Sequence, residues 1–124
     1  MESVDQLTIR RSRRLGLTAI DEQKCYRGYT LFCAWIDGAV ARLIDSLGET
    51  VHFWRLPYLP AFWSYLLPNG NLFSLGRTDN DGVVVVEPNW GEKGGILYEM
   101  DREGNVVWEH RDPYQHHDGR RTVS

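Results

Sequence analysis

The sequence is poor in cysteine, in long apolar runs and in net charge, and each shortage excludes a class of protein. Its two cysteines, Cys25 and Cys33, stand eight residues apart, which excludes a multi-disulfide framework and a paired-cysteine zinc site. The pattern favours two free thiols packed as small hydrophobic side chains, with one disulfide as the alternative. No stretch approaches the roughly 18 apolar residues of a transmembrane helix. A formal net charge of −3 argues against a nucleic-acid-binding surface.

Apolar positions nowhere recur at helical spacing for long, whereas aromatic residues and glycines are plentiful. Five Trp, six Tyr, four Phe and 12 Gly among 124 residues suit short strands joined by turns. The sequence therefore predicts one all-β domain. Residues 1–25 are the exception, because they carry the basic run RRSRR (10–14) without strand patterning. An export signal needs a longer apolar core than the one that follows this run, so we expect a poorly ordered basic segment and, by default, a cytoplasmic location.

From residue 26 onward, strand-like runs alternate with turn signals. Asn69-Gly70 is a strong hairpin signal, and Asp37-Gly38 is another. The stretch 94–118 is the best patterned, because apolar and polar residues alternate on both sides of the turn 101–105. We expect strands over 29–35, 39–45, 50–56, 62–67, 72–77, 83–86, 96–100 and 106–111.

An internal repeat of 56 residues relates two of these hairpins. Asp45 and Asp101 are 56 apart, as are Gly48 and Gly104, and each Asp-x-x-Gly turn leads into a strand with a tryptophan, Trp54 or Trp108. A period of this size is typical of β-propeller blades. We expect residues 62–77 and 96–111 to form one complete blade, residues 29–56 the last three strands of the blade before it, and residues 116–122 the first strand of the blade after it.

A blade buries both faces against its neighbours, so this partial propeller (26–124) would expose apolar faces if it stood alone. We therefore expect a fragment of a longer protein, whose apolar faces are covered by the remaining blades or by self-association. Neither a nucleic acid nor a membrane is expected as a partner.

Three motifs point to one family. The string GGILYEMDREGNVVWEHRDPYQHHD (94–118), with LLPNGN (66–71) and GYTLF (28–32), resembles the bacterial arylsulfotransferase family. The resemblance covers residues 26–118 and implies a six-bladed β-propeller. It also implies transfer of a sulfuryl group from an aryl sulfate ester to a phenol through a histidine nucleophile, with no cofactor and no metal. In the family another inner strand follows His-His-Asp, whereas this chain continues GRRTVS, so we expect the isolated chain to be inactive.

The resemblance also implies a set of site residues. His117 is the favoured nucleophile and His116 the second choice, Asp118 orients a ring, and Arg120 and Arg121 contact the sulfuryl anion. A neutral imidazole is nucleophilic near neutral pH, and cationic donors neutralise the sulfuryl oxygens. Because neighbouring residues of a strand point to opposite faces, we expect only one of the two histidines to face the propeller channel.

Structural roles compete with these functional ones. The His-His-Asp run is often only a hydrogen-bonded corner, and the whole chain can be a non-catalytic binding or scaffold segment of a propeller. His52 and His110 are expected to be half-exposed structural residues, and the five tryptophans to be packing residues. The glycine loop 91–95 is expected to connect strands rather than to cradle an anion, because no helix N-terminus follows it.

Overall fold

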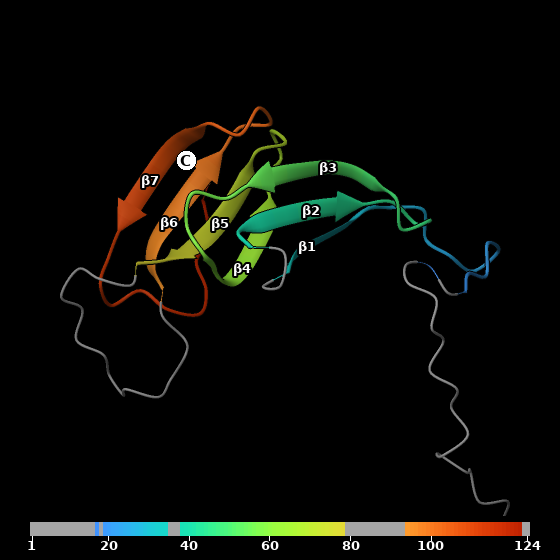
Figure 1. Ribbon diagram of the computed structural model, residues 1–124, viewed down its shortest axis with the longest axis horizontal. Coiled ribbons are helices and arrows are strands. Elements are labelled where there is room, and N and C mark those ends of the chain that lie inside the picture. The colour runs from blue at the N-terminus through green and yellow to red at the C-terminus, as the bar shows by residue number, and fades with distance from the viewer. Residues whose placement is uncertain (1–16, 18, 35–37, 79–93, 123–124) are drawn as a thin grey trace, which may run out of the picture.

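The computed structural model describes residues 17, 19–34, 38–78 and 94–122, and over these ranges the chain forms two antiparallel sheets and no helix (Figure 1). The predicted all-β class is confirmed. The basic run 10–14, the predicted strand 83–86, most of the glycine loop, Trp35 and Trp90 lie outside the described residues. No helix among the described residues is long and apolar enough to cross a membrane.

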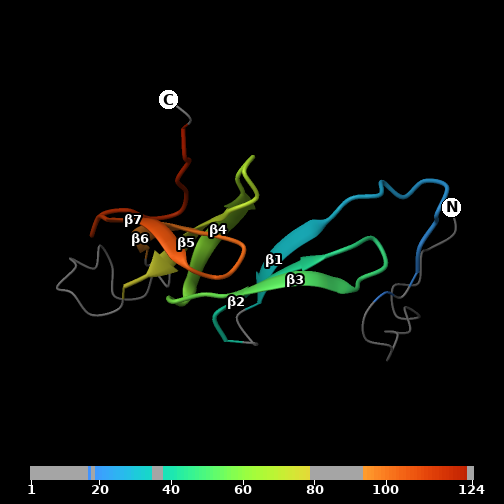
Figure 2. The same cartoon turned by 90° about the horizontal axis from the view of Figure 1, so that it is seen from above.

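The N-terminal sheet has three strands and the C-terminal sheet has four, each in simple up-and-down order. The strands are β1 (Thr30–Ala34), β2 (Val40–Ile44), β3 (Thr50–Arg55), β4 (Pro60–Leu66), β5 (Leu72–Arg77), β6 (Gly95–Met100) and β7 (Val106–Arg111). Within the described ranges these bounds agree with the predicted ones to within two residues, because short connections between alternating runs leave little choice of pairing. Figure 2 shows the two sheets as separate layers that meet near β3 and β4.

The main core lies where the sheets meet. Alternate residues of β6, namely Ile96, Tyr98 and Met100, are fully buried, and Trp54 of β3 packs into the same cluster. Gly76 of β5 belongs here for a steric reason: a Cβ at this position would lie 2.8 Å from Cγ2 of Ile96. Only glycine lets β5 and its neighbours approach this closely.

The C-terminal sheet buries its second face as well. Phe73 and Leu75 of β5 are 1% and 0% exposed and form a second cluster, against which Trp108 and Leu97 pack. This cover comes from the chain's own C-terminal segment, because Gly119 lies against Leu97 and Phe73. Strand β5 is therefore buried on both faces, as expected for a strand inside a layered β-protein.

The two turns of the repeat have the same conformation. In the DSLGE turn (45–49) and the DREGN turn (101–105), the first residue's N–H donates to the fifth carbonyl oxygen at 3.0 and 2.9 Å. Gly48 and Gly104 both have positive φ, 83° and 96°, which an L side chain adopts only with strain. The carboxylates of Asp45 and Asp101 each accept a backbone N–H four residues on, at 2.9 and 2.7 Å. The predicted repeat thus holds at the level of its turns.

The tryptophans of the repeat are not equivalent, although the sequence suggested that they were. Strand pairing places His52 opposite Leu43 and Trp108 opposite Glu99, so that Trp108 is the counterpart of His52. By the same register Trp54 corresponds to His110. The two indoles lie on the same side of their strands but two residues apart, because the 56-residue spacing is kept by the turns and not by the rings.

The predicted strand over residues 116–122 is wrong. No strand occurs between residues 112 and 122, and backbone groups of this segment bond to side chains instead. The N–H of Arg121 donates to Oη of Tyr65 at 2.6 Å, and the N–H of Gly119 donates to Oδ1 of Asp118 at 2.7 Å. A strand needs a neighbouring backbone to complete its ladder, and no described strand runs beside this segment.

Candidate functional site

The candidate site is the corner that follows β7. Asp112 begins it: its N–H donates to the carbonyl oxygen of Gly95 at 3.1 Å, and its Oδ1 accepts the N–H of Tyr114 at 2.9 Å. The second contact is an Asx turn, which reverses the chain at Pro113. A proline cannot continue the ladder, so the sequence Asp-Pro-Tyr ends the strand and directs the chain back over the C-terminal sheet.

Gln115 ties the corner to the start of β6. Its Oε1 accepts the N–H of Gly95 at 3.3 Å, and its Nε2 donates to the carbonyl oxygen of Asp118 at 3.3 Å. Gly94 lies directly against the backbone and side chain of Gln115, in a space that a Cβ would fill. The described glycines of the glycine loop thus serve close packing here.

The structure brings His116 and His117 together at this corner. Their Nδ1 atoms are 2.5 Å apart, and their ring planes are nearly perpendicular. His117 has φ 64°, the one positive φ of a non-glycine residue in the described part of the chain. Its ring stacks on Phe62 with centroids 5.6 Å apart. The two rings therefore lie side by side in solvent rather than on opposite faces of a strand, because the left-handed residue turns the chain between them.

A hydrogen bond between two Nδ1 atoms divides the chemistry of the pair. One ring donates its Nδ1–H, and the other accepts with an Nδ1 lone pair. When both rings are neutral, the donating ring carries a lone pair on Nε2 and the accepting ring carries Nε2–H. One imidazole is then nucleophilic at Nε2, and its neighbour can donate a hydrogen bond from Nε2. The pair offers a nucleophile and a hydrogen-bond donor in one compact unit.

The remaining predicted residues are placed on protein groups. The Asp118 carboxylate accepts the N–H of Gly119 and lies 3.9 Å from Nε of Arg120, so its recorded partners do not include a histidine ring. The Arg120 guanidinium lies over the rings of Tyr65 and Trp63, at 4.7 and 5.1 Å from their centroids. These are cation–π contacts, which hold the residue after the corner against the sheet.

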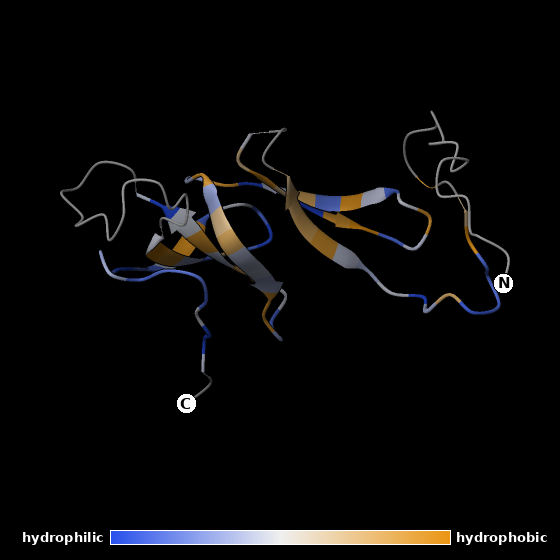
Figure 3. Ribbon diagram, turned by 90° about the horizontal axis from the view of Figure 1, so that it is seen from below, coloured by the Kyte–Doolittle hydropathy of each residue, from blue (hydrophilic) through white to orange (hydrophobic). Residues whose placement is uncertain are grey.

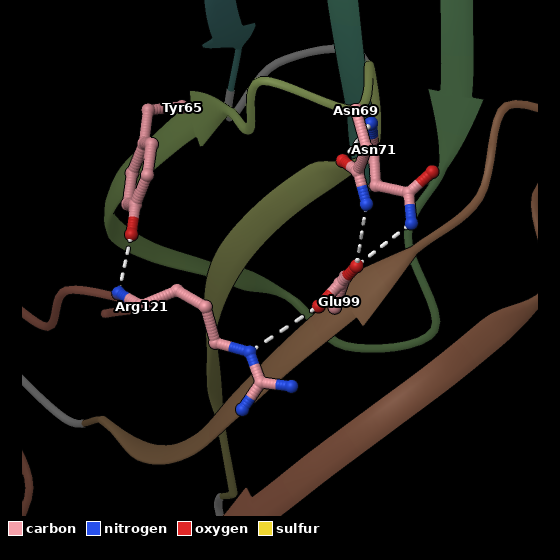
Figure 4. Close-up of polar contacts among 5 residues, drawn as sticks. All are labelled: Tyr65, Asn69, Asn71, Glu99 and Arg121. Atoms are coloured by element: carbon pink, nitrogen blue, oxygen red, sulfur yellow. Dashed lines mark hydrogen bonds and ion pairs between the residues drawn. The ribbon is translucent and has the colours of Figure 1, made fainter. Parts of the chain in front are cut away.

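Arg121 belongs to a polar cluster that the sequence did not indicate (Figure 4). Its Nε lies 3.4 Å from Oε2 of Glu99, and its guanidinium covers the ring of Trp108 at 4.1 Å. Glu99 is 7% exposed, and its Oε1 accepts Nδ2 of Asn71 at 2.7 Å and Nδ2 of Asn69 at 3.4 Å. A buried carboxylate needs such partners, because desolvation would otherwise oppose its charge.

The Asn-Gly-Asn turn therefore has a second role. Sequence reasoning recognised it only as a hairpin signal, yet Asn69 and Asn71 hold the buried carboxylate of Glu99, which in turn holds Arg121. The available signal was Glu99 itself, a charged residue within a well-patterned strand. The His pair thus lies between two anchors, Gln115 on one side and Arg121 on the other.

The other candidates have structural contacts. Nε2 of His52 lies 3.0 Å from the carbonyl oxygen of Arg102, and His110 stacks on Trp108. Cys25 and Cys33 are both free and partly buried, which confirms the prediction that they form no disulfide. Across the described ranges no cluster of three or more His, Cys, Asp or Glu is arranged to hold a metal ion.

Comparison with known proteins gives no relative for this chain: no protein-family model, no curated protein and no solved structure matches it. The functional argument therefore depends on the sequence motifs and on the geometry described above.

Proposed function

We propose that the chain is part of a six-bladed, arylsulfotransferase-like β-propeller in which the two sheets are successive blades. Support for the blades comes from the four-strand meander, the 56-residue repeat of the turns and the packing of Trp54 on the next hairpin. Support for the chemistry comes from the arylsulfotransferase-like motifs and from the paired imidazoles of His116 and His117. That pair is the observation on which the proposal depends most.

In the proposed reaction, Nε2 of His117 attacks the sulfur of an aryl sulfate ester. The bond between sulfur and the aryl oxygen breaks, and its electron pair leaves with the phenolate. His116 donates its Nε2–H to a sulfuryl oxygen as charge develops there. The oxygen of the acceptor phenol then attacks the sulfur, the N–S bond breaks, and the imidazole is restored while the acceptor's proton passes to solvent. The left-handed backbone of His117 fits this role, because strained residues cluster at functional sites.

The test follows release of 4-nitrophenolate from 4-nitrophenyl sulfate in the presence of phenol. It uses a complete propeller that contains this segment, because the resemblance implies further His and Arg positions on other blades. We expect His117→Asn to abolish release and His116→Asn to reduce it. His110→Asn is the matched control, since His110 is an exposed histidine on β7 away from the corner. Unchanged release from both corner variants would contradict the assignment.

A second candidate is a non-catalytic propeller segment that serves binding or scaffolding. The placement of Arg120 and Arg121 favours it, because both are engaged with the protein's own aromatic rings and carboxylates. The assay above separates the two candidates. A folded wild-type propeller that releases no nitrophenolate, and shows no sulfuryl adduct in its intact mass, would favour the scaffold.

A further inference from the structure

The contact between the sheets is made by a pair of rings on β3 that dock on a turn. Nε1 of Trp54 donates to the carbonyl oxygen of Asp101 at 2.9 Å, and Nε2 of His52 lies 3.0 Å from the carbonyl oxygen of Arg102. The two rings contact each other edge to face, with centroids 4.3 Å apart. The DREGN turn thus receives two N–H-bearing rings from the preceding sheet.

Strand β7 carries the same two ring types at the corresponding positions. Trp108 and His110 occupy the register positions of His52 and Trp54, and their rings stack with centroids 6.3 Å apart. The Arg121 guanidinium lies over the indole of Trp108. Within the part of the chain that the structure describes, however, no acceptor is recorded for the indole N–H or for the imidazole of His110.

The DSLGE turn has the matching deficit. It repeats the conformation of the DREGN turn, but no ring among the described residues donates to the carbonyl oxygens of Asp45 or Ser46. The turn instead lines an open cleft of about 390 Å³, together with Leu17 and Tyr26.

The outer face of the N-terminal sheet, beside this turn, is apolar and exposed. Phe32, Val51 and Phe53 on this face are 39%, 44% and 49% exposed, and Figure 3 shows the apolar colouring of these strands. The corresponding face of the C-terminal sheet, with Tyr98 and Met100, is buried by the N-terminal sheet of the same chain. By the repeat, the outer face is one that a neighbouring sheet would cover.

We infer that the chain associates head to tail with a second copy of itself. Trp108 and His110 of one copy dock on the DSLGE turn of the next, and the C-terminal sheet of the first covers the outer face of the N-terminal sheet of the second. The argument is continuity with the contact inside the chain: the same rings, the same turn and the same register occur once satisfied and once without partners. The two surfaces differ, so the interface is heterologous and repeats from copy to copy. The inference depends on the blade arrangement proposed above and not on sulfuryl transfer.

The experiment is sedimentation equilibrium of the full chain, with one variant for each side of the interface. The donor-side variant combines Trp108→Phe and His110→Ala, which keep most of the packing and remove both ring N–H groups. The acceptor-side variant is Phe53→Glu, because β7 carries Glu109 at the corresponding position and the repeat therefore tolerates it. Val107→Glu is the matched control, since Val107 is 53% exposed on the opposite side of β7 from Trp108. Circular dichroism checks that each variant is folded.

We expect the wild-type chain and Val107→Glu to show masses that rise with concentration above the 14.4 kDa monomer. Each interface variant should associate at least about tenfold more weakly, because two hydrogen bonds or an apolar contact are lost. An equimolar mixture of the two interface variants should stop at a dimer, since each supplies one intact surface. A monomeric wild type, unchanged association of either folded interface variant, or a mixture without dimers would overturn the inference, whatever the nitrophenolate assay shows. Association without nitrophenolate release would leave it standing and count against sulfuryl transfer.

Discussion

Trp54 donates its indole N–H to the carbonyl oxygen of Asp101 across 47 residues of sequence, and this bond joins the two sheets. It links the third strand of one sheet to the tip of the last hairpin in the other. The indole is 3% exposed, so both its apolar surface and its N–H are accounted for by the protein. The orientation of one sheet on the other is therefore set by a specific directional contact as well as by apolar burial.

The first prediction concerns this bond. Trp54→Phe should lower the free energy of unfolding by about 1 kcal/mol, because a ring of similar shape remains but Asp101 loses a donor. Trp108→Phe is the control: its indole N–H has no recorded acceptor in the described chain, so we expect a change below about 0.5 kcal/mol. Urea unfolding at low protein concentration measures both. Equal effects of the two substitutions would contradict the role of the Trp54 bond.

The second prediction concerns acid stability of the DREGN turn. Hydrogen bonds from the side chain and the backbone of Asn105 hold the pKa of Asp101 below its ordinary value of 3.8. The carboxylate thus stabilises the folded state above that pH, and this contribution is lost as the pH falls through the lowered pKa. Asp101→Asn keeps an acceptor for the N–H of Asn105 but has no charge to titrate. The stability difference between wild type and Asp101→Asn should shrink from pH 6 to pH 3, measured by thermal unfolding, and a constant difference would contradict the assignment.

The third prediction concerns the anchor behind the histidine pair. Arg121→Gln should cost about 1 kcal/mol, because the Glu99 carboxylate is buried but Arg121 is 39% exposed and two asparagines remain as donors. In a Glu99→Gln background the same substitution should cost less, and the difference is the coupling between the two side chains. Limited proteolysis should also cut earlier after residue 115 in Arg121→Gln. Additive effects in the double-mutant cycle would show that the pair is not coupled.

The fourth prediction concerns the thiol of Cys33. Burial raises the pKa of this thiol, while a hydrogen bond with the hydroxyl of Ser64 at 3.4 Å partly opposes the rise. The thiolate is the reactive form, so alkylation by iodoacetamide at neutral pH should be slower in the folded chain than in urea. Ser64→Ala should slow it further, because the opposing contact is removed. The measurement uses a Cys25→Ser background, and equal rates in the folded and unfolded chain would contradict it.

Local patterning in the sequence was enough to predict the strands and turns of the described ranges. Alternation placed β3 and β5 to β7 to within one or two residues, and Asp-x-x-Gly predicted the shared conformation of the 45–49 and 101–105 turns. These features depend on near neighbours only: side-chain period, turn chemistry and the conformational freedom of glycine.

The contacts between distant segments were decided by the tertiary structure. The sequence paired Trp54 with Trp108, whereas the register pairs Trp54 with His110, because a bulge and a turn count residues that an alignment of rings cannot. It placed His116 and His117 on opposite faces of a strand, whereas His117 adopts a left-handed conformation and turns its ring to its neighbour. Glu99 could not be recognised as an anchor, because its value comes from Asn71 and Arg121, which lie 28 and 22 residues away and meet it only after the sheet has formed. Side-chain period is a local property, but burial and hydrogen-bond partners depend on which segments pack together.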